Sequence, residues 1–371
     1  MKTVILSVAL CAGLMTSAMA QEKSAFKFEP VYNLKTTPVT TQDRTGTCWS
    51  FSTTSFIETE IIRQGGPEMN LSEMYFVRYA YPEKAQRYVM VHGEGNFSQG
   101  GQAHDVMNVL REHGMMTEDA YPGRRDVSKP YNHSELASSQ KVLLDNFIKQ
   151  RNAAPSELWY ETLDGVLNTY MGQLPDEVTY EGKSYTPQAL AEKMKINPDD
   201  YVELTSYSHH PWYSTFDLEI PDNWSHDQYY NLPLDDLMAV MDNALEKGYS
   251  FAWDGDVSEK FFSHKNGVAL VPVVDSLGFV PQKEKKITQE NRQKAFMSWQ
   301  STDDHLMHIT GLSKDQEGTR YYKTKNSWRD DSNDFGGYLY MSESFVRLHS
   351  VAIMVHRDAI PKEIAKKLFK K

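Results

Sequence analysis

Cysteine is nearly absent from this sequence of 371 residues, which contains only Cys11 and Cys48. The first lies in residues 1–20, which have the pattern of a removable signal peptide: Lys2 near the start, an apolar stretch, and small residues at 18–20. A buried N-terminal strand or helix is the alternative, and a lipidated Cys11 is a further one. The mature chain is then expected to keep Cys48 alone. An exported chain with one cysteine makes no internal disulfide, and its thiol is a candidate reactive group.

Long apolar runs and excess positive charge are also lacking. Beyond residue 20 the sequence has no run of the roughly 18 apolar residues that a membrane helix needs. Without the first 20 residues, 38 Lys and Arg stand against 50 Asp and Glu, a net charge of −12. This charge repels phosphate backbones, so neither a membrane nor a nucleic acid is the expected partner. We expect a globular, exported protein in the periplasm or outside the cell.

Helical patterns precede strand patterns along the chain. Helices are predicted at 47–64, from Ser72 to Tyr81, and at 102–113, and strand patterns follow Gly248. This order favours an α+β protein of two halves. Between them lies a polar stretch with several prolines and further helical patterns. The predicted organisation is a signal peptide (1–20), a helical half (21–124), a helical insertion (125–235) and a β-rich half (236–371).

Cys48 lies where a buried helix is predicted to begin. The amino end of a helix favours negative charge, and pairing with a histidine lowers a cysteine pKa from about 8.5 to about 3–4 in the best cases. A buried structural cysteine is the alternative interpretation. Because the thiol is at a helix start in an exported chain, a nucleophile is the prediction that we carry forward.

A base for this thiol has to come from among 12 histidines. Two strands, 306–312 and 321–325, flank a polar turn. Pairing Ser313 with Thr319 places His305 opposite Ser327, beside Asn326. An asparagine there can hold the imidazole in one tautomer, which is the third role in a catalytic triad.

Two other interpretations use the same region. His308 is a rival base, but it lies farther from Asn326 and on the other face of its strand. Asp303 and Asp304 with the two histidines would suit zinc, although the sequence offers no further ligand cluster elsewhere. We therefore expect neither a metal nor another cofactor.

Several short motifs together resemble the active-site segments of the papain family of cysteine peptidases. They are residues 42–51 (QDRTGTCWSF), 71–73 (LSE), 98–101 (SQGG), 304–307 (DHLM), 325–328 (KNSW) and 336–338 (GGY). The resemblance implies a papain-like two-domain fold. It implies Cys48 as nucleophile, His305 as base, Asn326 as its orienting group and Gln42 as an oxyanion donor. It also implies that the backbone at Gly100 and Gly101 binds extended substrate and that Trp328 shields the histidine.

The spacing of the motifs is most similar to the bleomycin hydrolase and aminopeptidase C branch. Cys48 and His305 are 257 residues apart, against about 130–150 in ordinary papain-like chains. The excess matches that branch's helical insertion. Residues 231–235 (NLPLD) and 253–257 (WDGDV) also resemble branch segments.

The branch implies an aminopeptidase acting on peptides, often as a homo-hexamer. Its members are usually cytosolic and end in a longer arm that reaches the substrate's α-amino group, whereas this sequence ends at Lys371. An endopeptidase with an open cleft is therefore the alternative. Acyl transfer with the same residues, or a non-catalytic assembly protein on the same scaffold, are further alternatives.

Overall fold

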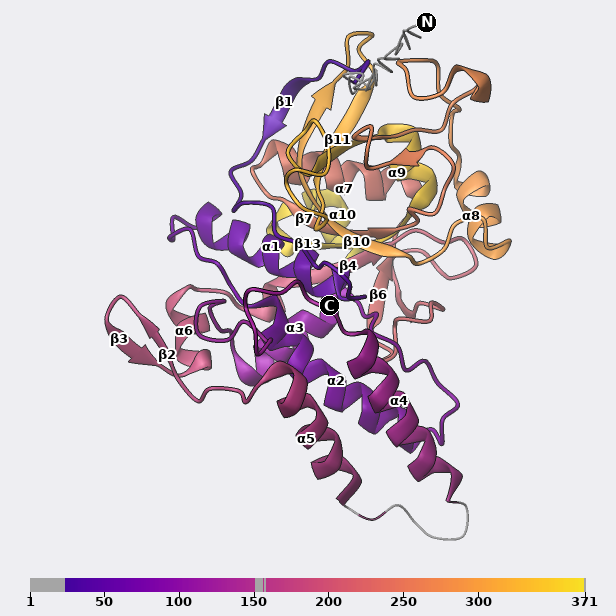
Figure 1. Ribbon diagram of the computed structural model, residues 1–371. Coiled ribbons are helices and arrows are strands. Elements are labelled where there is room, and N and C mark those ends of the chain that lie inside the picture. Colours follow the sequence, from indigo (N-terminus) through magenta and orange to yellow (C-terminus); the bar gives the residue numbers. More distant parts are fainter. Residues whose placement is uncertain (1–23, 151–155, 157, 370–371) are drawn as a thin grey trace, which may run out of the picture.

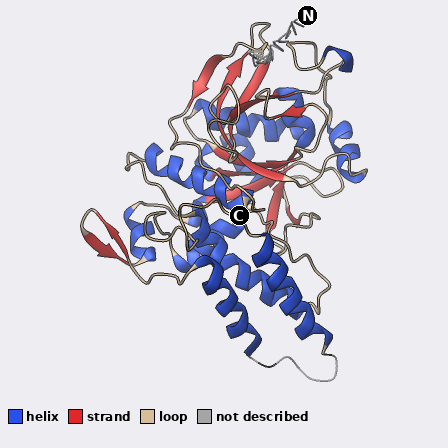
Figure 2. Cartoon of the chain, viewed as in Figure 1, coloured by secondary structure: helices blue, strands red, loops and turns tan. Residues whose placement is uncertain are grey.

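One part of the molecule is mainly helical, and the other holds a large mixed sheet with further helices around it, as Figures 1 and 2 show. The computed structural model describes residues 24–150, 156 and 158–369, so the predicted signal peptide lies outside the described residues. The helical part comprises α1 (Cys48–Arg63), α2 (Glu73–Met90), α3 (Ala103–His113), α4 (Ser134–Lys149), α5 (Leu158–Met171) and α6 (Pro187–Lys193), with the hairpin β2 (Val178–Tyr180) and β3 (Lys183–Tyr185).

The predicted end of α1 and start of α2 follow local chemistry, whereas α2 continues past the predicted end at Tyr81 to Met90. The Ser72 side chain accepts a hydrogen bond from the N–H of Tyr75 at 3.0 Å and so caps α2. Helix α1 is buried on nearly all sides and ends before Gly65, which has a φ of +80°. Such a left-handed conformation strains residues other than glycine, so Gly65 fixes this end.

The main sheet has the strand order β5-β6-β4-β13-β7-β10-β11-β12-β9-β8, with β1 beside β10. Its strands are β1 (Glu29–Asn33), β4 (Tyr201–Thr205), β5 (Thr215–Asp217), β6 (Gln228–Asn231), β7 (Phe251–Gly255), β8 (Phe262–Ser263), β9 (Val268–Ala269), β10 (His305–Lys314), β11 (Arg320–Lys325), β12 (Tyr338–Ser342) and β13 (Ser350–His356). Around it lie α7 (Leu234–Glu246), α8 (Gln289–Met297), α9 (Glu343–His349) and α10 (Lys362–Leu368). The content is α+β, as predicted.

The secondary structure of residues 125–235 differs from the prediction of a helical insertion. Helices α4 and α5 form its first part, but β4 and β6 join the main sheet, where β4 pairs with β13. The residues of β4 are buried throughout, and a strand inside a sheet satisfies its backbone groups without forming a helix. Likewise, β1 belongs to the predicted helical half but pairs with β10. The domain boundaries themselves stay a prediction.

Helix α1 packs directly against β10, and this contact joins the two parts. The amino end of α1 carries Cys48, and the first residue of β10 is His305. The fold therefore brings the predicted nucleophile and the predicted base to one boundary. Among the described residues, no helix has the length and apolar character needed to cross a membrane.

Candidate active site

The thiol of Cys48 is buried at the first residue of α1, with 8% of the residue exposed. The backbone of Leu306, the residue after His305, donates a hydrogen bond to its sulfur. The first N–H groups of a helix have no partner within the helix, so the Cys48 N–H needs a partner from outside α1. This places the predicted nucleophile beside the predicted base and at a source of positive partial charge.

Burial shifts the pKa of each group in the direction that favours its neutral form, the thiol and the uncharged imidazole. It raises the pKa of the Cys48 thiol to about 12, and the charges of nearby carboxylates add to this. It lowers the pKa of His305 to about 4. For the thiol taken alone, desolvation outweighs the helix end; the lower pKa expected from pairing with a protonated histidine stays a prediction. Proton transfer from Cys48 to His305 creates adjacent opposite charges, and their attraction opposes both penalties.

His305 and Asn326 contact each other as predicted, with Nε2 of the ring 2.8 Å from Oδ1 of the amide. The register that led to this expectation was wrong by two residues at the turn, because Ser313 pairs with Tyr321. The carboxylate of Asp315 accepts the N–H of Thr319 at 2.9 Å and sets the first pair of the turn. A β-bulge between Ile309 and Gly311 then reduces this two-residue error in register to one residue.

Asn326 is itself held on its other side by His264, which sequence reasoning missed. The Nδ2 atom of Asn326 lies 3.1 Å from Nδ1 of His264, whose Nε2 lies 2.6 Å from the Ser332 hydroxyl. Burial lowers the pKa of His264 to about 4, so its ring is neutral near pH 7 and Nδ1 can accept the amide proton. Residues 264 and 326 lie far apart in sequence, and no motif connects them.

Trp328 covers the histidine pair. Its ring centroid lies 4.7 Å from that of His305 and 5.1 Å from that of His264. An aromatic ring over a hydrogen bond excludes water, and the bond is stronger in the resulting low dielectric. The position agrees with the shielding function that the resemblance implies for this residue.

Gln42 is buried and its amide is fixed by two hydrogen bonds. Its Nε2 donates to the carbonyl of Thr45 at 2.7 Å, and its Oε1 accepts from the Ser327 hydroxyl at 2.6 Å. An amide nitrogen carries two hydrogens, so one remains for an oxyanion. The bond to Ser327 ties the Gln42 segment directly to the residue after Asn326.

Gly101 lies next to Trp49, whereas Gly100 lies against the Asp222 carboxylate. The N–H of Gly100 donates to the Ser98 hydroxyl at 3.2 Å, and its carbonyl accepts from Lys84. A Cβ on Gly101 would lie 2.6 Å from the Asp105 carboxylate and 3.0 Å from the Trp49 ring, so only glycine fits there. Gly101 itself is buried, so substrate contact at either glycine stays a prediction.

The rival histidine and the zinc interpretation find no support in the geometry. His308 is fully buried, with Nδ1 3.0 Å from the Ser55 hydroxyl, and it pairs across the sheet with Lys325. It does not reach Asn326. Within the described part of the chain, the clusters with metal-binding geometry contain none of the four residues of the zinc interpretation.

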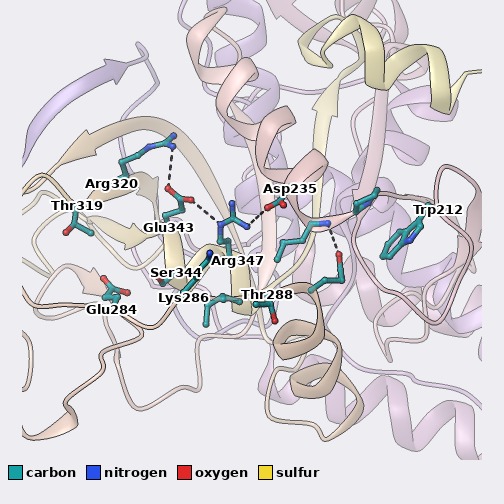
Figure 3. Close-up of a pocket in the computed structure, with 14 residues that line it drawn as sticks. Trp212, Asp235, Glu284, Lys286, Thr288, Thr319, Arg320, Glu343, Ser344 and Arg347 are labelled. Carbon is teal, nitrogen blue, oxygen red and sulfur yellow. Dashed lines mark hydrogen bonds and ion pairs between the residues drawn. The ribbon is translucent and has the colours of Figure 1, made fainter.

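A cavity of about 800 Å³ lies apart from these residues and is shown in Figure 3. Charged side chains that line it pair with each other: Arg347 contacts Asp235 at 2.8 Å and Glu343 at 3.1 Å. Neither Cys48 nor His305 borders it. The chemistry of the chain is therefore concentrated at the boundary between α1 and β10 and not in this cavity.

Comparisons with known proteins agree with the fold and the site. The model of the peptidase C1-like family matches residues 174–371, and that of the papain family of cysteine proteases matches residues 28–192. The fold and the site define a papain-like cysteine peptidase. Since the first match covers more than half of the sequence, the chain belongs to the peptidase C1-like family.

Individual relatives indicate one branch of this family. Mitochondrial cysteine proteinase 1 of Saccharomyces cerevisiae is 23% identical, over 95% of this chain and 82% of its own length. Aminopeptidase G of Lactobacillus delbrueckii subsp. lactis is 22% identical, over 97% and 90%. Human bleomycin hydrolase is 21% identical, over 88% and 82%. The crystal structure of PepW from Lactobacillus rhamnosis superposes with a TM-score of 0.74 at 17% identity, covering 92% of this chain and 84% of that one.

These matches confirm the predicted papain-like fold and the bleomycin hydrolase and aminopeptidase C branch. The protein is an enzyme, a cysteine-type peptidase with peptides as its substrates.

Proposed function

We propose that this enzyme cleaves peptide bonds through a thioacyl intermediate on Cys48. The thiol sulfur attacks the substrate carbonyl carbon while its proton passes to Nδ1 of His305. The imidazolium then protonates the leaving amine. The neutral imidazole next takes a proton from a water molecule, which attacks the thioester and restores the thiol. Gln42 and the Cys48 N–H hold the oxyanion.

The bond between His305 and Asn326 is the observation that supports this assignment most strongly. Because Asn326 Oδ1 accepts from Nε2 at 2.8 Å, the other ring nitrogen is free to take a proton. The Leu306 backbone, which directly follows His305, lies close enough to the Cys48 sulfur to affect the thiol pKa, so the thiol lies near the start of β10.

A Cys48→Ala variant tests the assignment. It should lose all measurable peptidase activity and keep its melting temperature, since the change removes one small buried atom. Retained hydrolysis by a pure, folded variant would contradict the proposal. An Asp235→Asn variant, changed at an exposed side chain on the separate cavity, serves as the control and should keep full activity.

Aminopeptidase activity is the favoured specificity, supported by the relatives named aminopeptidase G and bleomycin hydrolase. An endopeptidase with an open cleft is the alternative. One short fluorogenic peptide, compared with a free and an acetylated amino end under reducing conditions, separates the two. Cleavage of the free form alone supports the aminopeptidase, and equal or better cleavage of the acetylated form supports the endopeptidase.

Two further alternatives remain within the same scaffold. An acyl transferase would pass the acyl group to an added amine or thiol in preference to water, which product analysis would detect. In a non-catalytic protein, a thiol-directed inhibitor would fail to label Cys48. Export to the periplasm or the exterior stays a prediction, which signal-peptide processing in cells tests. Assembly into a hexamer also stays a prediction, which the molecular mass in solution tests.

A further inference from the structure

The segment 99–101 is anchored to both sides of the nucleophile. The Gly46 N–H donates to Oε1 of Gln99 at 2.9 Å, and the Trp49 indole N–H donates to the Gln99 carbonyl at 3.0 Å. Gly46 lies two residues before Cys48, and Trp49 directly follows it. An extended substrate that lies along this segment, as the papain resemblance implies, therefore lies beside the Cys48 sulfur.

The two halves of a substrate lie on opposite sides of Cys48. In the proposed mechanism the leaving amine takes its proton from His305 at the start of β10. The acyl half, which contains the attacked carbonyl and the residues before it, then lies on the side of segment 99–101. Whatever covers this segment limits how many residues can precede the cleaved bond.

A loop of the 125–235 region, residues 218–227, lies directly on Gly100. A Cβ on Gly100 would overlap the Asp222 carboxylate, so the two are in contact. Asn96 holds the loop there, since its Nδ2 donates to the Pro221 carbonyl at 3.1 Å and to Oδ1 of Asp222 at 2.6 Å. The Gly100 N–H already donates to the Ser98 hydroxyl at 3.2 Å. Gly100 therefore offers a substrate neither open space nor a free N–H.

The same loop also reaches Gly101. The Trp224 indole N–H donates to Oδ2 of Asp105 at 3.0 Å. That oxygen would be 2.6 Å from a Cβ on Gly101, and Gly101 is buried. Residues 221–224 thus extend over the glycine pair, with Asp222 at one glycine and Trp224 bonded to the carboxylate that lies on the other.

The loop has its own internal support. Asn223 is 3% exposed, and its Nδ2 donates to Oδ1 of Asp217 at 2.9 Å and to the Asp227 carbonyl at 3.1 Å. Its Oδ1 accepts the Asp227 N–H at 3.0 Å. The Ser225 hydroxyl lies 3.0 Å from Nε2 of the buried His104 in α3. A buried amide that joins both ends of a loop holds it in one conformation, so residues 221–224 form a fixed wall.

We propose that residues 221–224 close the cleft on the acyl side of Cys48 and thereby determine the aminopeptidase specificity. The residue whose carbonyl is attacked fits, and a further residue toward the amino end collides with Asp222 at Gly100. Steric exclusion of this kind rejects longer substrates without any new attractive contact. This inference rests on the proposed function, and it assigns the specificity to a loop that lies about 150 residues before the end of the chain.

A gain of cleavage in a trimmed wall tests the proposal. A panel of single amino acid coumarin amides with free amines first identifies the residue X that the wild type releases fastest. The value of kcat/KM is then measured for X-coumarin and for acetyl-Ala-X-coumarin, which has one bond to cleave and a longer acyl side. The variants are Asp222→Gly and Asp222→Gly with Trp224→Ala. Glu219→Gln is the matched control, because Glu219 is on the same loop but lies 2.7 Å from His210.

The wild type and Glu219→Gln should prefer X-coumarin at least twentyfold. The double variant should cleave acetyl-Ala-X-coumarin at least tenfold faster than the wild type does, and Asp222→Gly alone at least threefold faster. Cleavage of X-coumarin should change less than fivefold. Melting temperatures identify the folded variants. Equal cleavage of both substrates by the wild type, or an unchanged preference in either folded variant, would overturn the wall. Absence of all hydrolysis by the wild type would instead contradict the proposed function.

Discussion

Asn326 joins two histidines in one hydrogen-bond chain, with Oδ1 2.8 Å from Nε2 of His305 and Nδ2 3.1 Å from Nδ1 of His264. The same Oδ1 also accepts the N–H of Ser327 at 2.7 Å. An amide held on both sides cannot turn over, so it always presents its oxygen to His305. The proton on Nε2 is thereby fixed, and the nitrogen that receives the thiol proton stays free.

Replacing Asn326 with alanine should lower kcat by about 10- to 100-fold, because an imidazole without its orienting acceptor samples the wrong tautomer and orientation. KM should change little, since the side chain faces the histidines. Steady-state kinetics on one fluorogenic peptide checks this. An unchanged kcat in a folded variant would remove Asn326 from the catalytic set.

His264 should act as a positioning residue. His264→Phe removes the acceptor for Asn326 Nδ2 but keeps a ring beside Trp328, so we expect kcat to fall about tenfold with KM unchanged. The lower limb of the pH–kcat profile should shift, because His305 loses part of its support. His264→Gln restores an acceptor and should recover most of the activity. A purely structural role would instead lower the melting temperature of both variants and leave the pH profile in place.

Gln42→Ala should lower kcat by about 10²- to 10³-fold, as expected when one donor to a developing oxyanion is removed. The substrate carbonyl carries little charge before attack, so KM should stay within about threefold. Gln42→Glu is the matched control, since it keeps the shape but places an acceptor at the oxyanion, and it should be at least as impaired. A larger change in KM than in kcat would contradict the assignment.

His104 predicts how stability depends on pH. Burial alone would lower the pKa of His104, but the carboxylates of Glu203 and Asp105 outweigh it and raise the pKa to about 10; Glu203 lies 2.7 Å from Nδ1. A pKa raised in the folded state stabilises it fully below the unfolded pKa of about 6.5. That contribution, on the order of a few kcal/mol, is lost as pH rises from about 6.5 to about 10.

Urea unfolding of the wild type and of His104→Asn between pH 6 and 10 measures this contribution. The difference in unfolding free energy should be largest at pH 6 and shrink steadily toward pH 10. A difference that stays constant over this range would show that the charge of His104 does not contribute.

Several features of the fold followed from local sequence because their causes are local. Gly65 and Ser72 mark helix ends through backbone conformation and capping, and both lie where predicted. Residues 201–231 misled the prediction, because a buried strand such as β4 takes its hydrogen bonds from β13, about 150 residues later in the chain. Nothing in the local pattern specifies such a partner.

The sequence by itself determined the kinds of groups at the site and their order: a single thiol at a helix start, a histidine and an asparagine beside one hairpin, and a glutamine before the thiol. Such motifs can be recognised in the sequence because each consists of residues that are close together in the chain. Only the tertiary structure decided the register that joins His305 to Asn326 and the support that Asn326 receives from His264. Each of these requires segments far apart in sequence to meet, and long-range packing, not local propensity, sets such contacts.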